Sequence, residues 1–86
     1  MAIRYTRHAE YKFEVLREHG FPVTPDQVAD ALMHPDRVIP QSEGRLVAQK
    51  RLTEEHVLRV IYRIEGNDAV VITFYPGRRD RYENEI

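Results

Sequence analysis

The chain has 86 residues, a formal net charge of −1, a charged fraction of 31% and an apolar fraction of 42%. This length suits one domain rather than two, and the composition is that of a folded protein rather than a disordered one. The sequence has no cysteine, which excludes disulfides and thiolate zinc sites. No apolar run approaches the roughly 20 residues that span a bilayer, and the N-terminus lacks an apolar segment. We therefore expect a cytoplasmic protein that makes no membrane contact.

The first part of the chain predicts a short strand followed by a helix. Residues 3–5 are β-prone, Thr6 can cap the helix, and Gly20 can end it. The helix has a narrow apolar stripe that consists of Ala9, Phe13 and Leu16. His8 and Lys12 lie one turn apart beside this stripe, so their side chains should project together.

A second helix has the clearer start signal. Thr24 is the expected N-cap, Pro25 takes the first helical position, and Gln27 completes a capping box. The buried stripe of this helix consists of Val28, Ala31 and Leu32. His34-Pro35 should end the helix, because the residue before a proline is disfavoured in the α region.

The rest of the chain predicts strands separated by turn-forming residues, at 37–39, 45–52, 56–64 and 69–75. Pro40 should confine the first of these to a sheet edge, and Pro76-Gly77 should end the last in a turn. Alternation places Thr73 and Tyr75 on the same face as Val71. It does not decide which face of the sheet is buried.

Helices that come first and strands that come later are typical of the α+β class. The expected architecture is two N-terminal helices packed on one face of a twisted antiparallel β-sheet. Residues 1–86 form one domain in this interpretation, with a charged C-terminal tail at 78–86.

An ordered set of short segments along nearly the whole chain resembles a known family. The segments are Thr6-Arg7-His8-Ala9, His19-Gly20-Phe21, His34-Pro35-Asp36-Arg37-Val38, Gln49-Lys50-Arg51, Leu58-Arg59-Val60-Ile61, Val71-Ile72-Thr73-Phe74-Tyr75-Pro76, Arg78-Arg79 and Arg81-Tyr82. Together they are similar to the DUF4258 family of small prokaryotic proteins, which belongs to the RelE-like, BrnT-like group of toxin folds. No single segment is specific, so the resemblance depends on their order.

This resemblance implies a RelE-like sheet that carries its helices on one face and offers the other face to RNA, either mRNA or ribosome-bound. It also implies a cognate antitoxin protein as partner in a toxin–antitoxin module. The sequence departs from the family at Lys12, because the helix often carries arginine four residues after the histidine. Lysine keeps the charge but loses the bidentate geometry for phosphate.

The chemistry suggested by the resemblance is metal-independent endoribonuclease cleavage. It needs a proton-transfer group, cations for the phosphate and a donor to the leaving oxygen. The candidate catalytic residues are His8, Lys50, Tyr75 and Arg79. The candidate RNA contacts are Lys12, Arg51, Arg59, Thr73, Arg78 and Arg81. No cofactor and no metal site are expected, because the four histidines lack close ligand spacing and there is no cysteine.

Each candidate also has a structural explanation. His8 can bond a backbone carbonyl, Lys50 can extend from a buried face to the sheet edge, and acidic neighbours can neutralise the tail arginines. A second function therefore remains open, namely a catalytically silent RNA- or protein-binding domain. The chain can be a monomer, or a homodimer paired through the edge strand at 37–39.

Overall fold

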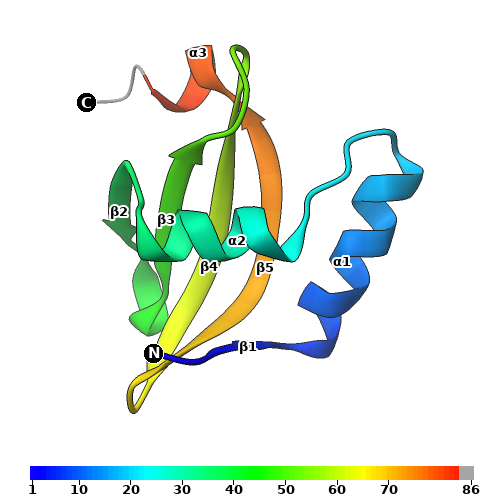
Figure 1. Ribbon diagram of the computed structural model, residues 1–86. Helices are drawn as coiled ribbons and strands as arrows, with labels where there is room; N and C mark the ends of the chain where they lie inside the picture. Colours follow the sequence, from blue (N-terminus) through cyan, green and yellow to red (C-terminus); the bar gives the residue numbers. More distant parts are fainter. Residues whose placement is uncertain (84–86) are drawn as a thin grey trace.

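The computed structural model describes residues 1–83, which form five strands, two N-terminal helices and two short helical segments (Figure 1). The strands are β1 (Ile3–Tyr5), β2 (Arg37–Pro40), β3 (Leu46–Arg51), β4 (His56–Glu65) and β5 (Asp68–Arg78). The helices are α1 (Arg7–Glu18), α2 (Pro25–Met33) and α3 (Arg79–Tyr82), with the 3₁₀ turn η1 (Ser42–Gly44) between β2 and β3. In this described part of the chain, no helix is both long and apolar enough to cross a membrane.

The strands form one sheet in the order β1-β5-β4-β3-β2. Strands β2 to β5 pair with their neighbours in antiparallel fashion, and a tight turn at Gly66, whose φ is +62°, connects β4 to β5. β1 pairs with β5 in parallel, which is possible because the two strands are far apart in the chain and no hairpin joins them. The expected α+β class, with two N-terminal helices on a sheet, is confirmed, and the parallel β1 makes the sheet a mixed one.

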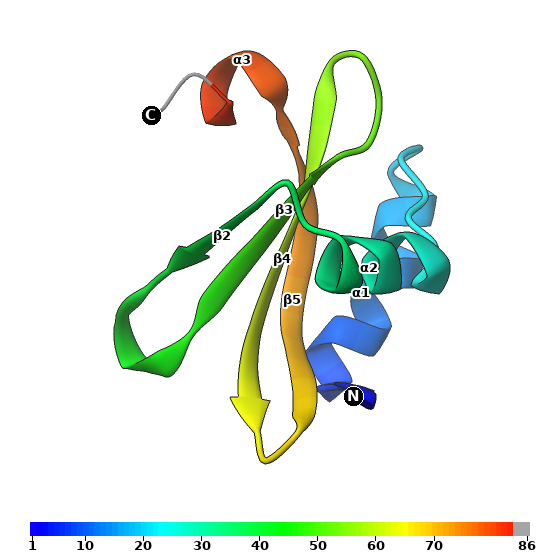
Figure 2. The same cartoon turned by 60° about the vertical axis from the view of Figure 1, so that its left-hand side comes forward.

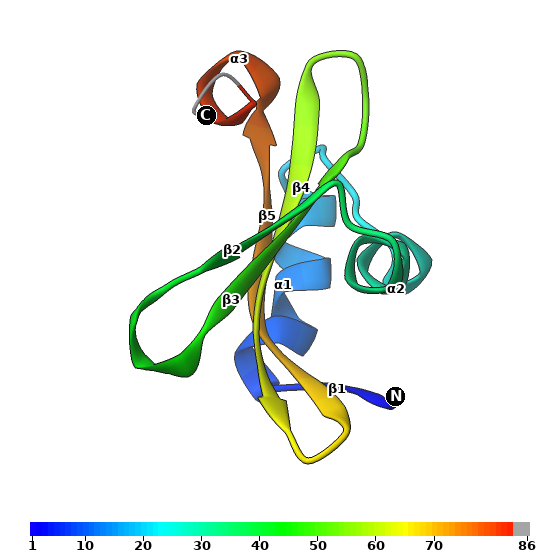
Figure 3. The ribbon, with the colours of Figure 1, turned by 90° about the vertical axis from the view of Figure 1, so that its left-hand side faces the viewer.

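Both long helices lie on the same face of the sheet. α1 packs against β1 and β5, and α2 packs against β3 and β4. Figures 2 and 3 show α3 on the opposite side, at one end of the sheet. The buried sheet residues beneath the helices are Ala48, Leu58, Val60, Tyr62, Ala69, Val71 and Phe74. The structure thereby decides which face carries the helices and the main core. We call the other one the open face, although Val47, Gln49 and Val57 on it are also buried.

Local signals position α1 and α2 as the sequence predicts. Thr24 and Gln27 form both bonds of a capping box at the start of α2. Thr6 accepts a hydrogen bond from the Ala9 N–H at 3.1 Å and donates one to the Ile72 carbonyl, also at 3.1 Å. The Thr6 hydroxyl therefore both caps α1 and ties it to β5.

A β-bulge in β5 corrects one prediction about side-chain direction. Val71 pairs with Tyr62 while Thr73 pairs with Ile61, so Ile72 is an additional residue between them. Val71 is consequently buried under the helices, whereas Thr73 lies on the opposite face. The predicted common face for Val71, Thr73 and Tyr75 is wrong, because a bulge reverses the alternation that follows it.

The predicted end of the last strand at Pro76-Gly77 is also wrong, since β5 continues to Arg78. β1 pairs only with Ala69–Val71, so the later part of β5 has a neighbour on the β4 side and forms a sheet edge on the other. A proline is tolerated at such an edge because no partner strand needs its missing N–H. The tail that follows forms α3, and its residues 84–86 lie outside the described part.

Replacing Thr6 by valine should lower the free energy of unfolding by about 1–3 kcal/mol, because Ala9 N–H loses its acceptor and the Ile72 carbonyl loses its donor. Chemical denaturation followed by circular dichroism measures the change. Thr6→Ser keeps the hydroxyl and is the matched control, with an expected loss below about 1 kcal/mol. Equal stability of the two variants would contradict the anchoring role of this hydroxyl.

Candidate functional site

A row of four polar side chains crosses the open face of the sheet. The strand register places Arg37 beside Gln49, Gln49 beside Arg59, and Arg59 beside Tyr75. Neighbouring strands lie about 4.8 Å apart, so side chains of this size can touch from one strand to the next. We call these four residues the polar row.

The guanidinium of Arg59 is the centre of the polar row. Its exposed fraction is only 8%. Its Nε donates to the Tyr75 hydroxyl at 3.1 Å, and its Nη1 donates to the Gln49 side-chain oxygen. The ring of Tyr82 covers the guanidinium, with its centroid 4.2 Å from the Arg59 Cζ. All of these partners are electrically neutral.

The second amino group of Arg59, Nη2, has neither a carboxylate partner nor a hydrogen-bond acceptor among residues 1–83. In the same part of the chain, every fully buried side-chain nitrogen and oxygen has a partner, so this amino group must retain access to solvent. A buried cation without a counterion is costly, and an anion at its accessible edge offsets that cost. The polar row therefore has the properties of an anion-binding site.

α3 packs over one end of the polar row. The Arg37 Nη1 donates to the Tyr82 carbonyl at 3.3 Å, while the Tyr82 ring rests on Gly77 of β5. A Cβ atom at Gly77 would collide with that ring, so only glycine permits this packing. Arg51 reaches the same end of α3, with its Nη2 3.6 Å from an oxygen of the C-cap residue Glu83.

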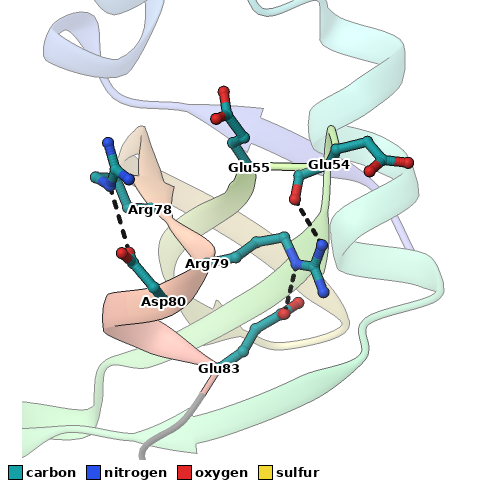
Figure 4. A pocket seen from close by; sticks show the side chains of 6 residues that line it. All are labelled: Glu54, Glu55, Arg78, Arg79, Asp80 and Glu83. Atoms are coloured by element: carbon teal, nitrogen blue, oxygen red, sulfur yellow. Dashed lines mark hydrogen bonds and ion pairs between the residues drawn. The ribbon is translucent and has the colours of Figure 1, made fainter.

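A pocket of about 320 Å³ lies beside α3, lined by Glu54, Glu55, Arg78, Arg79, Asp80 and Glu83 (Figure 4). The Arg79 Nε bonds a Glu83 oxygen at 2.6 Å, and its Nη1 donates to the Glu54 carbonyl. The Arg79 hydrogen bond lowers the pKa of Glu83 below its usual value, with a further contribution from Arg51. Arg79 therefore joins α3 to the β3–β4 turn, and its charge is already paired.

The structure does not bring the four predicted catalytic residues together. Lys50 lies on the helix-bearing face, where its Nζ donates to the His34 carbonyl at the end of α2 at 2.8 Å. Tyr75 belongs to the polar row, and Arg79 points towards the β3–β4 turn. Lys50 is separated from Tyr75 because side chains alternate between the two faces of a strand.

His8 approaches the open face from the edge of β5. Its Nε2 lies 3.2 Å from the Thr73 hydroxyl, and Thr73 is two residues from Tyr75 on the same face. His8 is exposed, so its imidazole is accessible to a ligand on this side. His8, Thr73, Tyr75 and Arg59 are thus the predicted residues that share one region of the molecule.

The remaining predicted RNA contacts are dispersed. Lys12 is half-buried on α1, one turn after His8. Arg78 pairs with Asp80 at 3.3 Å, and the Arg81 Cζ lies 5.8 Å from the Tyr82 ring centroid. Arg78 and Arg81 therefore lie at α3, whereas Lys12 lies on α1.

Sequence reasoning missed three residues of the site, namely Arg37, Gln49 and Tyr82. Gln49 alternates with Arg51 along β3, which placed both on one face, but only the register with β4 shows that Gln49 meets Arg59. Tyr82 lay within the tail, where no local pattern predicts packing on a sheet. Within residues 1–83, no group of three histidine, aspartate or glutamate side chains is arranged to hold a metal ion.

No protein-family model matches the chain, and no significant match was found among curated proteins or solved structures. The resemblance to DUF4258 and the RelE-like group therefore stays a hypothesis that is based on the sequence segments.

Replacing Gln49 by leucine should destabilise the fold by about 1–3 kcal/mol, because Arg59 loses one of its two acceptors. Adding Arg59→Met to that variant should restore the free energy of unfolding to within about 1 kcal/mol of the parent, because the buried charge is then removed as well. Chemical denaturation of the three proteins measures both effects. A double variant less stable than Gln49→Leu alone would show that the charge itself stabilises the fold.

Proposed function

We propose that this protein is a toxin-type RNA-binding protein that receives single-stranded RNA on the open face of its sheet. The observation that carries the proposal is the Arg59 guanidinium, which is buried without a carboxylate partner in residues 1–83 and has one amino group that lacks an acceptor there. Arginine donors match phosphate oxygens in geometry and charge. Tyr75, which is hydrogen-bonded to Arg59, supplies an aromatic surface suited to an unpaired base.

The charge distribution favours binding at one site over general attraction to nucleic acid. The net charge of −1 gives little long-range attraction to a polyanion. Several arginines are neutralised within the chain, including Arg4 and Arg63, which both contact Glu65. Affinity should therefore depend on a few phosphate contacts at the polar row.

In a toxin–antitoxin module, as the family resemblance implies, the antitoxin would be the protein partner.

Binding of a fluorescently labelled short single-stranded RNA, followed by anisotropy, tests this proposal. Arg59→Gln should weaken binding by about tenfold to a hundredfold, since a charge-assisted hydrogen bond contributes about 1.5–3 kcal/mol. It should also reduce the slope of log affinity against log salt by about one. Thermal unfolding of the variant checks that the fold is retained.

The matched control is Arg63→Gln, which removes a half-buried arginine that belongs to the same strand and is paired with Glu65 at 2.5 Å. Its RNA affinity should stay within about twofold of the parent, because exposed ion pairs contribute little and the residue is outside the polar row. Equal losses in both variants, or no RNA binding by the parent protein, would refute the proposal.

Metal-independent RNA cleavage is a second candidate function, favoured by the accessible His8 imidazole at 3.2 Å from the Thr73 hydroxyl. Histidine exchanges protons near neutral pH, as removal of a 2′-hydroxyl proton requires. If the protein cleaves RNA in the presence of a chelator, His8→Ala should slow cleavage by about a hundredfold or more. Mapping of new RNA 5′ ends, in vitro and after tightly controlled expression in a bacterial host, measures this.

His19→Ala is the matched control for cleavage. His19 is also an exposed histidine of the α1 region, but its Nδ1 bonds the Val15 carbonyl at 2.7 Å, away from the polar row. Equal cleavage by the two variants would exclude His8 as the proton-transfer group. Intact RNA with the parent protein, together with normal growth of the host, would leave RNA binding without catalysis as the function.

A further inference from the structure

The ring of Tyr82 lies in a place that has the shape and chemistry of a site for a flat aromatic group. Gly77 forms its floor, because a Cβ there would overlap the ring atoms Cδ2 and Cε2. The Arg59 guanidinium stacks against the ring with its Cζ 4.2 Å from the centroid. Tyr75 lies next to it, with the two ring centroids 6.4 Å apart and tilted by 59°.

None of these contacts is specific to a tyrosine. A bare glycine surface accepts any planar group, and a guanidinium attracts the face of any electron-rich ring. Every nucleobase presents a flat π-face and stacks on aromatic and guanidinium planes. The place occupied by the Tyr82 ring therefore suits an unpaired base.

Displacement of the Tyr82 ring requires only the C-terminal end of α3 to move. α3 spans only Arg79–Tyr82 and has no side-chain N-cap, and such a short helix is not stable by itself. At its first residue α3 is held to the β3–β4 turn, because the Arg79 N–H donates to the Glu55 carbonyl at 2.8 Å and the Arg79 Nη1 donates to the Glu54 carbonyl. At the Tyr82 end its contacts with the sheet include the 3.3 Å bond from Arg37 to the Tyr82 carbonyl and the 3.6 Å pair between Arg51 and Glu83. The Arg51 side chain is 56% exposed, and an ion pair to so exposed a cation at 3.6 Å contributes little to stability.

We propose that the place under the Tyr82 ring is a nucleobase site, which a base of bound RNA enters when α3 lifts from Gly77 and Arg59. The Arg59 Nη2, which has no acceptor within residues 1–83, then bonds a phosphate of the same RNA. In the absence of RNA, Tyr82 covers Arg59 and limits its contact with water. This inference rests on the proposed RNA binding and adds the chemical group that the site recognises.

The test compares the parent protein with Tyr82→Ala, Tyr82→Phe and Gly77→Ala. The probes are a labelled short single-stranded RNA and an abasic oligomer of the same length, which keeps the phosphates but lacks the bases. Tyr82→Ala empties the site, whereas Tyr82→Phe keeps the covering ring and is the matched control. Gly77→Ala also dislodges the ring, but its new methyl group occupies the floor on which a base would lie.

Tyr82→Ala should bind the RNA about threefold to thirtyfold more tightly than the parent, since about 0.5–2 kcal/mol of ring–guanidinium attraction no longer competes. For the abasic oligomer, the gain in affinity of Tyr82→Ala over the parent should be smaller. Tyr82→Phe should bind like the parent, and Gly77→Ala should show no gain for RNA. Thermal unfolding verifies that each variant is folded.

Three results would overturn the nucleobase site while leaving RNA binding intact. The first is that Tyr82→Ala gains as much affinity for the abasic oligomer as for RNA. The second is that Gly77→Ala gains as much RNA affinity as Tyr82→Ala does. The third is that Tyr82→Ala binds RNA more weakly than the parent. The last result would mean that Tyr82 itself stacks on the base. If neither the parent nor any variant binds RNA, the proposed function fails and the nucleobase site fails with it.

Discussion

The burial of the Arg59 guanidinium among neutral groups is the constraint around which the open face is organised. Its two bonded nitrogens fix the side chains of Gln49 and Tyr75, and its plane supports the ring of Tyr82. A buried cation usually has an anionic partner, because desolvation of a charge is costly. Within residues 1–83 no carboxylate fills this role, so the positive charge is not neutralised by a neighbouring side chain there.

The course of β5 determines where the other groups lie. Its bulge at Ile72 turns Thr73 and Tyr75 to the open face, and its continuation past Pro76 extends the surface on which α3 packs. Gly77 is the position where this strand has no side chain, and the Tyr82 ring fills that space. The irregular strand β5 thus supplies Gly77 beneath the Tyr82 ring, Tyr75 beside that ring, and Thr73 as the contact of His8.

The parts of the site that could be predicted are those with a local chemical signal. Arg59, Thr73, Tyr75 and His8 were candidates because of their side-chain chemistry, and the structure places them in one region. Lys50 was an equally plausible cation, but the alternation of β3 directs it to the end of α2. Arg79 was predicted from its charge alone, which does not reveal that Glu83 already pairs with it.

The sequence by itself determined the order of the two long helices and the five strands, the N-caps of both long helices and the α+β class. These features depend on neighbouring residues, such as the capping box of Thr24 and Gln27 and the apolar, β-branched residues of β4. Only the tertiary structure decided which sheet face is buried, how β1 pairs, and that Gln49, Arg59 and Tyr82 meet. Those contacts join residues far apart in the chain. No single local segment predicts the register between two strands or the packing of a tail on a sheet.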